Sequence, residues 1–77
     1  MPRAQYVVAK QEGEWKITFG GKQFGPYTTE KAAIRAAVDA AHGTGKLGYD
    51  AQVVSLGEDN KRRTEWTYGQ DPYPPKD

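Results

Sequence analysis

Residues 28–45, TTEKAAIRAAVDAAHGTG, constrain the fold most, because they predict one amphipathic helix whose apolar side is mostly alanine. A threonine at the N-cap, Glu30 in the first turn and Gly43 at the C-cap predict about three to four turns. The helix has a polar strip on one side, formed by Lys31, Arg35, Asp39 and His42. Its opposite side is apolar and mostly small, formed by Ala33, Ile34, Ala37, Ala40 and Ala41. Small side chains allow close approach, so we expect the helix to cover a sheet that carries bulky residues.

The segments before the helix predict the first part of that sheet. Residues 4–10 (AQYVVAK) favour a strand, and residues 14–19 (EWKITF) alternate with Trp15, Ile17 and Phe19 on one side. Two glycines then favour a tight turn into a third short strand within KQFGPY, whose proline restricts that strand to an edge.

The segments after the helix predict a second hairpin. The sequence favours strands over Tyr49–Leu56 and Arg62–Tyr68. Between them, residues 57–60 (GEDN) are all turn formers. The predicted fold class is therefore α+β, a two-layer sandwich of an antiparallel sheet of four to five strands with one helix on one face, in the order ββ(β)αββ. We expect one small α+β domain over residues 1–69 and a proline-rich C-terminal tail over residues 70–77.

Amino-acid composition limits the cellular compartments and the classes of protein to which the chain could belong. The 77 residues include no cysteine, so neither disulfides nor thiolate zinc ligands supplement a thin core. No apolar run approaches the roughly 20 residues of a membrane span, and the N-terminus lacks the apolar segment of a signal peptide. We expect a cytoplasmic protein without membrane contact. The formal net charge of +1 is far from the basic excess of a dedicated nucleic-acid binder.

Catalytic and metal-binding patterns are weak. His42 is the single histidine, and its place on the polar strip near the helix end favours a solvated or dipole-pairing role. GEDN lacks the spaced acids of a calcium loop, and in GTGKLG the lysine is followed by leucine where a phosphate loop needs serine or threonine. We expect no enzymatic activity, no cofactor and no metal, and we interpret GTGKLG as a flexible connection.

One basic cluster, Lys61, Arg62 and Arg63, lies beside Trp66 and Tyr68. Strand alternation points Arg62, Trp66 and Tyr68 to one side, so the aromatics are expected in the core and the cations at an edge that they protect from aggregation. The alternative is a surface for nucleic acid or an acidic partner, formed by the three cations together with Lys16.

The tail TYGQDPYPPKD is open to three interpretations. Pro72, Pro74 and Pro75 favour an extended polyproline path, and Tyr73 is a large amphipathic ring. The tail is expected to fold back as a strap in which Tyr73 covers an edge or a gap. A terminus without fixed structure and a ligand for an aromatic groove of a partner are the other two interpretations.

The pattern YVV, W.I, T.EKA, AA..A, VVSL, RR.E and TYG resembles the bacterial family domain of unknown function 2188, from Tyr6 through Tyr68. That resemblance implies a small cytoplasmic α+β domain and brings no established activity with it. Residues 14–41 are also similar to the strand, strand, helix segment of AP2-type and integrase-arm DNA-binding domains, whose DNA-reading face would here include Lys16, Thr18 and Arg63.

These observations predict a binding or assembly module that acts by protein–protein interaction or self-association. One helix covers one face of a sheet, so homodimerisation through the opposite face or through an edge strand would bury more surface. Nucleic-acid binding through Lys16, Arg62 and Arg63 is the alternative.

Overall fold

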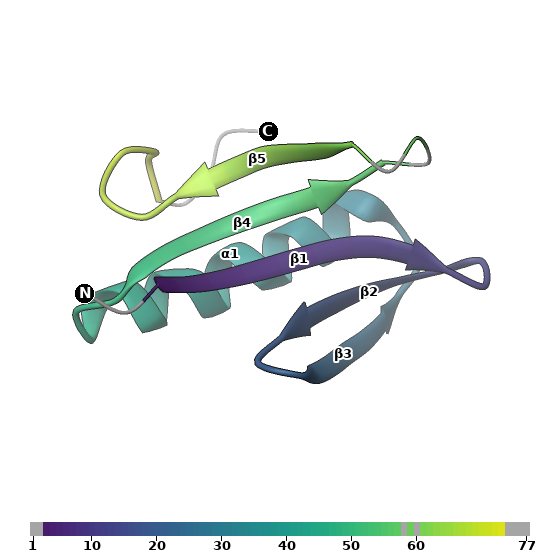
Figure 1. The fold of residues 1–77 in the computed structure, drawn as a ribbon, viewed down its shortest axis with the longest axis horizontal. Helices are drawn as coiled ribbons and strands as arrows, with labels where there is room; N and C mark the ends of the chain where they lie inside the picture. Colours follow the sequence, from purple (N-terminus) through teal and green to yellow (C-terminus); the bar gives the residue numbers. More distant parts are fainter. Residues whose placement is uncertain (1–2, 58, 60, 74–77) are drawn as a thin grey trace.

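The structure, a computed structural model, describes residues 3–57, 59 and 61–73. Five strands and one helix follow one another along the chain: β1 (Arg3–Gln11), β2 (Glu14–Phe19), β3 (Lys22–Tyr27), α1 (Glu30–Lys46), β4 (Asp50–Leu56) and β5 (Arg62–Thr67). The helix lies across one face of the sheet, mainly over β1 and β4 (Figure 1). The predicted α+β fold, one helix on a five-stranded sheet, is confirmed.

The strands lie in the order β3-β2-β1-β4-β5, so β1 is central and β3 and β5 form the edges. Three pairings are antiparallel as expected, but β1 and β4 are parallel, with Arg3 opposite Asp50 and Ala9 opposite Leu56. The sheet is therefore mixed. The physical reason is that α1 carries the chain back to the end of the sheet where β1 begins, so β4 starts beside the start of β1 (Figure 1).

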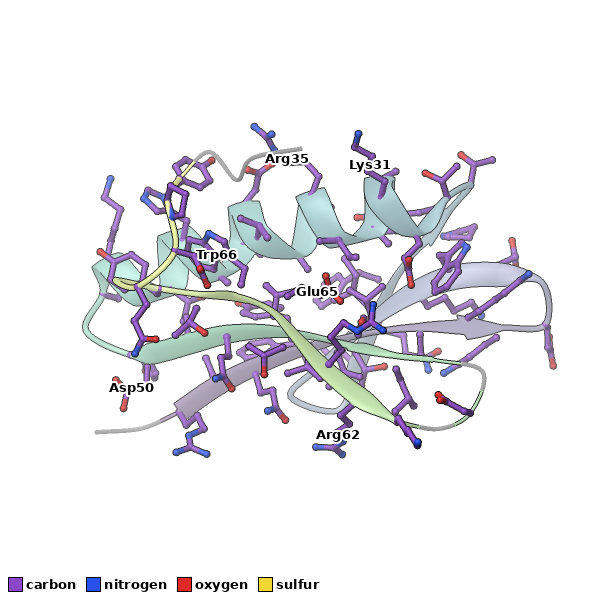
Figure 2. All side chains as sticks on the ribbon, turned by 90° about the horizontal axis from the view of Figure 1, so that it is seen from above. Lys31, Arg35, Asp50, Arg62, Glu65 and Trp66 are labelled. Atoms are coloured by element: carbon purple, nitrogen blue, oxygen red, sulfur yellow. The ribbon has the colours of Figure 1, made fainter. Side chains whose placement is uncertain are left out.

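The core lies between α1 and the sheet (Figure 2). Its sheet layer is formed by Tyr6, Val8, Ile17, Val53 and Trp66, each at most 6% exposed. The helix contributes small residues at four-residue spacing, Ala33, Ala37, Ala41 and Gly45, with Val38 beside them. Large side chains on the sheet thus meet small ones on the helix, as the alanine-rich pattern predicted.

The start of α1 agrees with the prediction and its end does not. Thr29 is the N-cap, and its hydroxyl accepts a hydrogen bond of 3.1 Å from the backbone N–H of Ala32. The helix does not end at Gly43 but continues to Lys46, with Leu47 as the C-cap, so the predicted connection GTGKLG is helical in its first part. A Cβ at Gly45 would overlap the ring of Tyr68, so glycine permits a close contact between the last helical turn and the chain after β5.

A β-bulge in β5 changes which way its side chains point. Val53 pairs with Trp66, whereas the next residue, Val54, pairs with Thr64, so Glu65 is the extra residue. Trp66 faces α1 as predicted, but the bulge reverses the alternation, and Arg62 points to the opposite face (Figure 2). The expectation that Arg62 and Trp66 share a face was wrong, because strict alternation does not hold across a bulge.

Candidate functional site

The sheet face that points away from α1 is called the open face. No helix or strand of the described residues covers it, and Asp50 and Arg62 project from it in Figure 2. Cross-strand partners share a face, and the register places these residues there: Gln5, Val7 and Ala9 of β1, Lys16 and Thr18 of β2, Gln23 of β3, Gln52, Val54 and Leu56 of β4, and Arg62, Thr64 and Thr67 of β5.

The centre of the open face is apolar and uncharged. Val7, Ala9 and Leu56 are partly buried, and Val54 is only 3% exposed although no layer of the fold lies over it. Amide and hydroxyl side chains of glutamine and threonine border these four residues, and at one end Lys16 lies opposite Ala9 and Arg62 opposite Leu56. An apolar centre depleted of charge inside a polar rim is the arrangement found in protein–protein interfaces.

Arg62 explains why Val54 is covered. A guanidinium nitrogen, Nη1 of Arg62, donates a long hydrogen bond of 3.5 Å to Oε1 of Gln5. Because β4 lies between β5 and β1, this contact carries the arginine side chain across β4, where Val54 lies. The cover is an exposed, flexible side chain, which can move aside at low cost when a partner docks.

The structure separates the four cations that the sequence analysis grouped. Lys16 and Arg62 lie on the open face, at the same end of the sheet, opposite Ala9 and Leu56 respectively. Arg63 pairs with Ser55 on the side of α1, so it does not belong to the open face. Lys61 lies in the turn before β5, where its backbone N–H donates 3.1 Å to Oδ1 of Asp59.

A groove of about 300 Å³ at the β4–β5 turn holds the basic cluster together with acids. Lys61, Arg62 and Arg63 line it, but so do Glu30 and Asp59. The acids oppose the cations, so the groove is a poor site for a phosphate, which needs an excess of positive charge.

A second concave surface lies between the β2–β3 hairpin and α1. It is an apolar groove of about 310 Å³ with Tyr6, Phe19 and Phe24 on the sheet side and Ala36 and Ala40 on the helix side. Tyr6 and Phe19 stack with ring centroids 4.2 Å apart, and Phe24 is 45% exposed at the edge of the sheet. The alanines leave this groove open.

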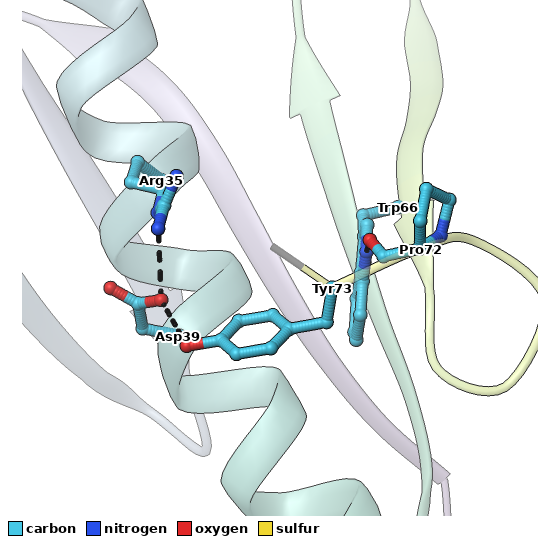
Figure 3. Close-up of polar contacts among 5 residues, drawn as sticks. All are labelled: Arg35, Asp39, Trp66, Pro72 and Tyr73. Atoms are coloured by element: carbon cyan, nitrogen blue, oxygen red, sulfur yellow. Dashed lines mark hydrogen bonds and ion pairs between the residues drawn. The ribbon is translucent and has the colours of Figure 1, made fainter. Parts of the chain in front are cut away.

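The described part of the tail lies against α1 and β5. The carbonyl of Pro72 accepts a hydrogen bond of 2.9 Å from Nε1 of Trp66 (Figure 3). The ring of Tyr73 stacks on the ring of His42, with centroids 3.8 Å apart. The Tyr73 hydroxyl donates 2.7 Å to Oδ1 of Asp39. Pro74 and Pro75, which the sequence analysis named with this segment, lie outside the described residues.

The contact between Tyr73 and Asp39 changes the pKa of the Tyr73 hydroxyl. The hydrogen bond to the Asp39 carboxylate raises the pKa of the Tyr73 hydroxyl, and burial and the negative charge of Asp39 act in the same direction. Arg35, whose Nε lies 3.6 Å from Oδ1 of Asp39, opposes this effect and lowers the pKa of Tyr73.

Sequence reasoning missed three contacts between side chains, those of Ser55 with Glu65 and of Tyr73 with Asp39 and His42. Ser55 is buried, and its hydroxyl donates 2.7 Å to Oε2 of Glu65, a residue that faces α1 only because of the bulge. Asp39 and His42 were placed on the polar strip without a partner, and the hydrogen-bonding hydroxyl and the flat ring of Tyr73 were the signals that pointed to one. Within the described ranges, no group of three or more histidine, cysteine, aspartate or glutamate residues could hold a metal ion.

A family model for an uncharacterized protein conserved in bacteria, DUF2188, matches residues 5–68, from the third residue of β1 to the residue after β5. The chain belongs to this family. No curated protein and no solved structure shows a significant match. The family relationship agrees with the resemblance seen in the sequence, and the family itself carries no assigned activity. Within the part of the chain that the structure describes, no helix is long and apolar enough to cross a membrane.

Proposed function

We propose that this chain is a non-enzymatic assembly module of the cytoplasm, whose open face associates with the open face of a second copy. The observation that carries the proposal is the uncharged apolar centre formed by Val7, Ala9, Val54 and Leu56 on the sheet face that α1 leaves uncovered. Two such faces pack at about 10 Å and bury the apolar strip of both copies.

The edge strands support association through the face rather than through an edge. On β3, Pro26 has no N–H to donate, and the pairing with β2 is irregular between Trp15 and Ile17. On β5, the bulge at Glu65 interrupts the ladder, and Arg62 and Arg63 bring two cations to its start. Proline, bulges and charged residues at an edge disfavour strand addition.

The size of the open face predicts a weak, reversible dimer. Five strands about 4.8 Å apart and about six residues long give a face of roughly 24 by 20 Å. Covering this face on both copies removes roughly 1,000 Å² from water, which is near the lower limit of specific interfaces. We therefore expect a dimer that dissociates at low micromolar concentration and forms at high micromolar concentration.

Sedimentation equilibrium between about 20 and about 500 µM tests the proposal. The average mass should rise from monomer toward dimer with concentration, and Leu56→Lys should abolish the rise because it places a charge in the apolar centre. Leu47→Lys is the matched control, since Leu47 is 78% exposed in the α1–β4 connection, away from the open face. A wild-type chain that stays monomeric at the highest concentration contradicts the proposal.

Nucleic-acid binding is a second candidate function, supported by Lys16 and Arg62 at one end of the open face. Fluorescence anisotropy of labelled single- and double-stranded oligonucleotides at about 50 and about 200 mM salt tests it, since phosphate contacts weaken steeply with salt. Arg62→Glu should abolish such binding, while Arg63→Glu, which changes a neighbouring cation on the side of α1, should change it little. Absence of binding at both salt concentrations rules out this candidate.

A further inference from the structure

The tail residues Pro72 and Tyr73 occupy a defined place on the domain, called the tail slot and formed by Asp39, His42 and Trp66. Figure 3 shows two of these residues, Asp39 and Trp66, beside the tail. A tight turn after β5 aims the tail at it. The backbone N–H groups of Gln70 and Asp71 donate 3.2 and 3.0 Å to the carbonyl of Thr67, and Oδ2 of Asp71 accepts 2.8 Å from the N–H of Thr67.

The walls of the slot are held by the domain and not by the tail. Trp66 is 2% exposed and packs in the core, and Asp39 pairs with Arg35 one helical turn away. His42 lies on α1, with its ring 5.7 Å from the ring of Tyr68. Trp66 is thus fixed by the core, and Asp39 and His42 are carried by α1, so the framework of the slot belongs to the domain, which is the property of a preformed binding site.

The occupant is held loosely by comparison. Tyr73 is 43% exposed and Pro72 is also exposed, so the tail lies in an open slot and not beneath another layer. The tail nevertheless contacts three complementary groups. The indole N–H of Trp66 donates a hydrogen bond to the carbonyl of Pro72. The ring of Tyr73 stacks on His42, and its hydroxyl donates a hydrogen bond to the carboxylate of Asp39. These are the contacts of a bound peptide, supplied by a tethered one.

The chemistry of the slot selects one kind of segment. Proline pre-sets the extended backbone that presents its carbonyl to Trp66, and aromatic surfaces commonly receive such segments. Asp39 accepts a hydrogen bond, so it favours tyrosine over phenylalanine at the next position. An additional negative charge on that ring would be repelled by Asp39.

We propose that the tail slot is a recognition site for a proline–tyrosine segment of a partner protein, and that the chain's own Pro72–Tyr73 occupies it at rest. The short tether gives the tail a local concentration on the order of millimolar, so a partner segment competes with the tail for the slot. Release of the tail opens the site. This inference is independent of the open face, which lies on the other side of the sheet.

The probe is a capped peptide with the sequence of residues 70–75, Gln-Asp-Pro-Tyr-Pro-Pro, added to the full-length Tyr73→Ala variant. The readout is the NMR signal of the Trp66 indole N–H, which changes when its acceptor leaves. We expect Tyr73→Ala to shift this signal, and the peptide to return it toward the wild-type position with a dissociation constant on the order of 1 mM. A peptide with phenylalanine in place of tyrosine should bind several-fold more weakly, and the wild-type chain, whose own tail competes for the slot, should bind the tyrosine peptide about twofold more weakly than the variant.

Two results would overturn the proposal. One is a Trp66 signal in folded Tyr73→Ala that the peptide does not move at about 10 mM. The other is equal peptide binding by the wild-type chain and the variant, which would mean that the tail does not occupy the recognition site. Tyr73→Phe keeps the ring and removes only the hydroxyl, so it provides a second variant if Tyr73→Ala fails to fold. It should bind the tyrosine peptide more tightly than the wild-type chain does.

Discussion

The two faces of the sheet bury valines by different means. On the side of α1, Val8 and Val53 are fully buried beneath a helix that contributes alanine and glycine. On the open face, Val54 is 3% exposed, but its cover is the side chain of Arg62 and the neighbouring polar residues. Similar exposed fractions thus arise from a fixed layer on one side and from flexible side chains on the other.

This difference bears on function because a fixed layer and a flexible cover respond differently to a partner. The helix can leave the sheet only if the domain unfolds, since α1 supplies one of the two layers that enclose the core. Arg62 is tied to Gln5 by one long hydrogen bond and can rotate away from Val54. The open face therefore has apolar surface that association can use without disrupting the fold.

The largest effect is expected where the helix approaches most closely. Gly45→Ala places a Cβ against the ring of Tyr68 and should lower the free energy of unfolding by about 3 kcal/mol, at the upper end of overpacking costs. Gly43→Ala is the matched control, because nothing lies within 4 Å of its added Cβ. It should stabilise the helix by about 0.5–1 kcal/mol. Urea unfolding measures both, and equal effects would show that the close approach is not a constraint.

The two valines of β4 compare the faces directly. Val53→Ala should cost about 2 kcal/mol, since α1 and the sheet cannot fully close the resulting cavity. Val54→Ala should cost about 1 kcal/mol, because the side chains over it relax into the space. Urea unfolding of the two variants under the same conditions measures both losses of unfolding free energy. A larger loss for Val54→Ala than for Val53→Ala would contradict our account of the open face.

Polar contacts on the side of α1 should also contribute more to the free energy of unfolding than polar contacts on the open face, although by smaller amounts. The hydroxyls of Tyr6 and Thr44 form a hydrogen bond of 2.7 Å between β1 and α1, and Tyr6→Phe should cost about 1 kcal/mol of unfolding free energy. Gln5→Ala removes the acceptor of Arg62 on the open face and should change stability by less than about 0.5 kcal/mol. Thermal or urea unfolding measures both changes, and a cost for Gln5→Ala that matches the cost for Tyr6→Phe would contradict the distinction.

The smallest effect concerns the tail, which neither face of the sheet covers. Hydrogen bonding to Asp39 raises the pKa of Tyr73, so its stabilising contribution is complete below the ordinary tyrosine value of about 10 and is lost as the pH rises through the higher folded-state value. Titration of the Trp66 indole signal should therefore show release of the tail above about pH 10. In Tyr73→Phe this step should be absent, and a step that persists in that variant would assign the release to another group.

Local sequence signals predicted the elements of this fold and several of their ends. Thr29 caps the helix, and the alternation of Trp15, Ile17 and Phe19 placed the core side of β2, because caps and periodicity depend on neighbours in sequence. Gly43 and Gly45 are equivalent as local signals. Only the structure distinguishes them: the helix continues through both, and Gly45 alone lies against the ring of Tyr68, which is remote in sequence.

Long-range pairing also decided what the sequence left open about the candidate site. The extra residue Glu65 is visible only against the register of β4, and it moves Arg62 to the open face and leaves Arg63 beside α1. The parallel pairing of β1 and β4 aligns Val7 with Val54 and Ala9 with Leu56, which creates the apolar centre. Neither pairing has a signature within its own strand, so the composition of the open face followed only from the structure.

The most direct test of the central claim compares the valine methyl groups of the two faces by NMR as the protein concentration rises from about 20 µM to about 1 mM. If the open face joins two copies, the methyl signals of Val7 and Val54 shift with concentration, while those of Val8 and Val53 beneath α1 stay in place. Methyl signals of Val7 and Val54 that do not move over this range, or that move no more than those of Val8 and Val53, would contradict association through the open face.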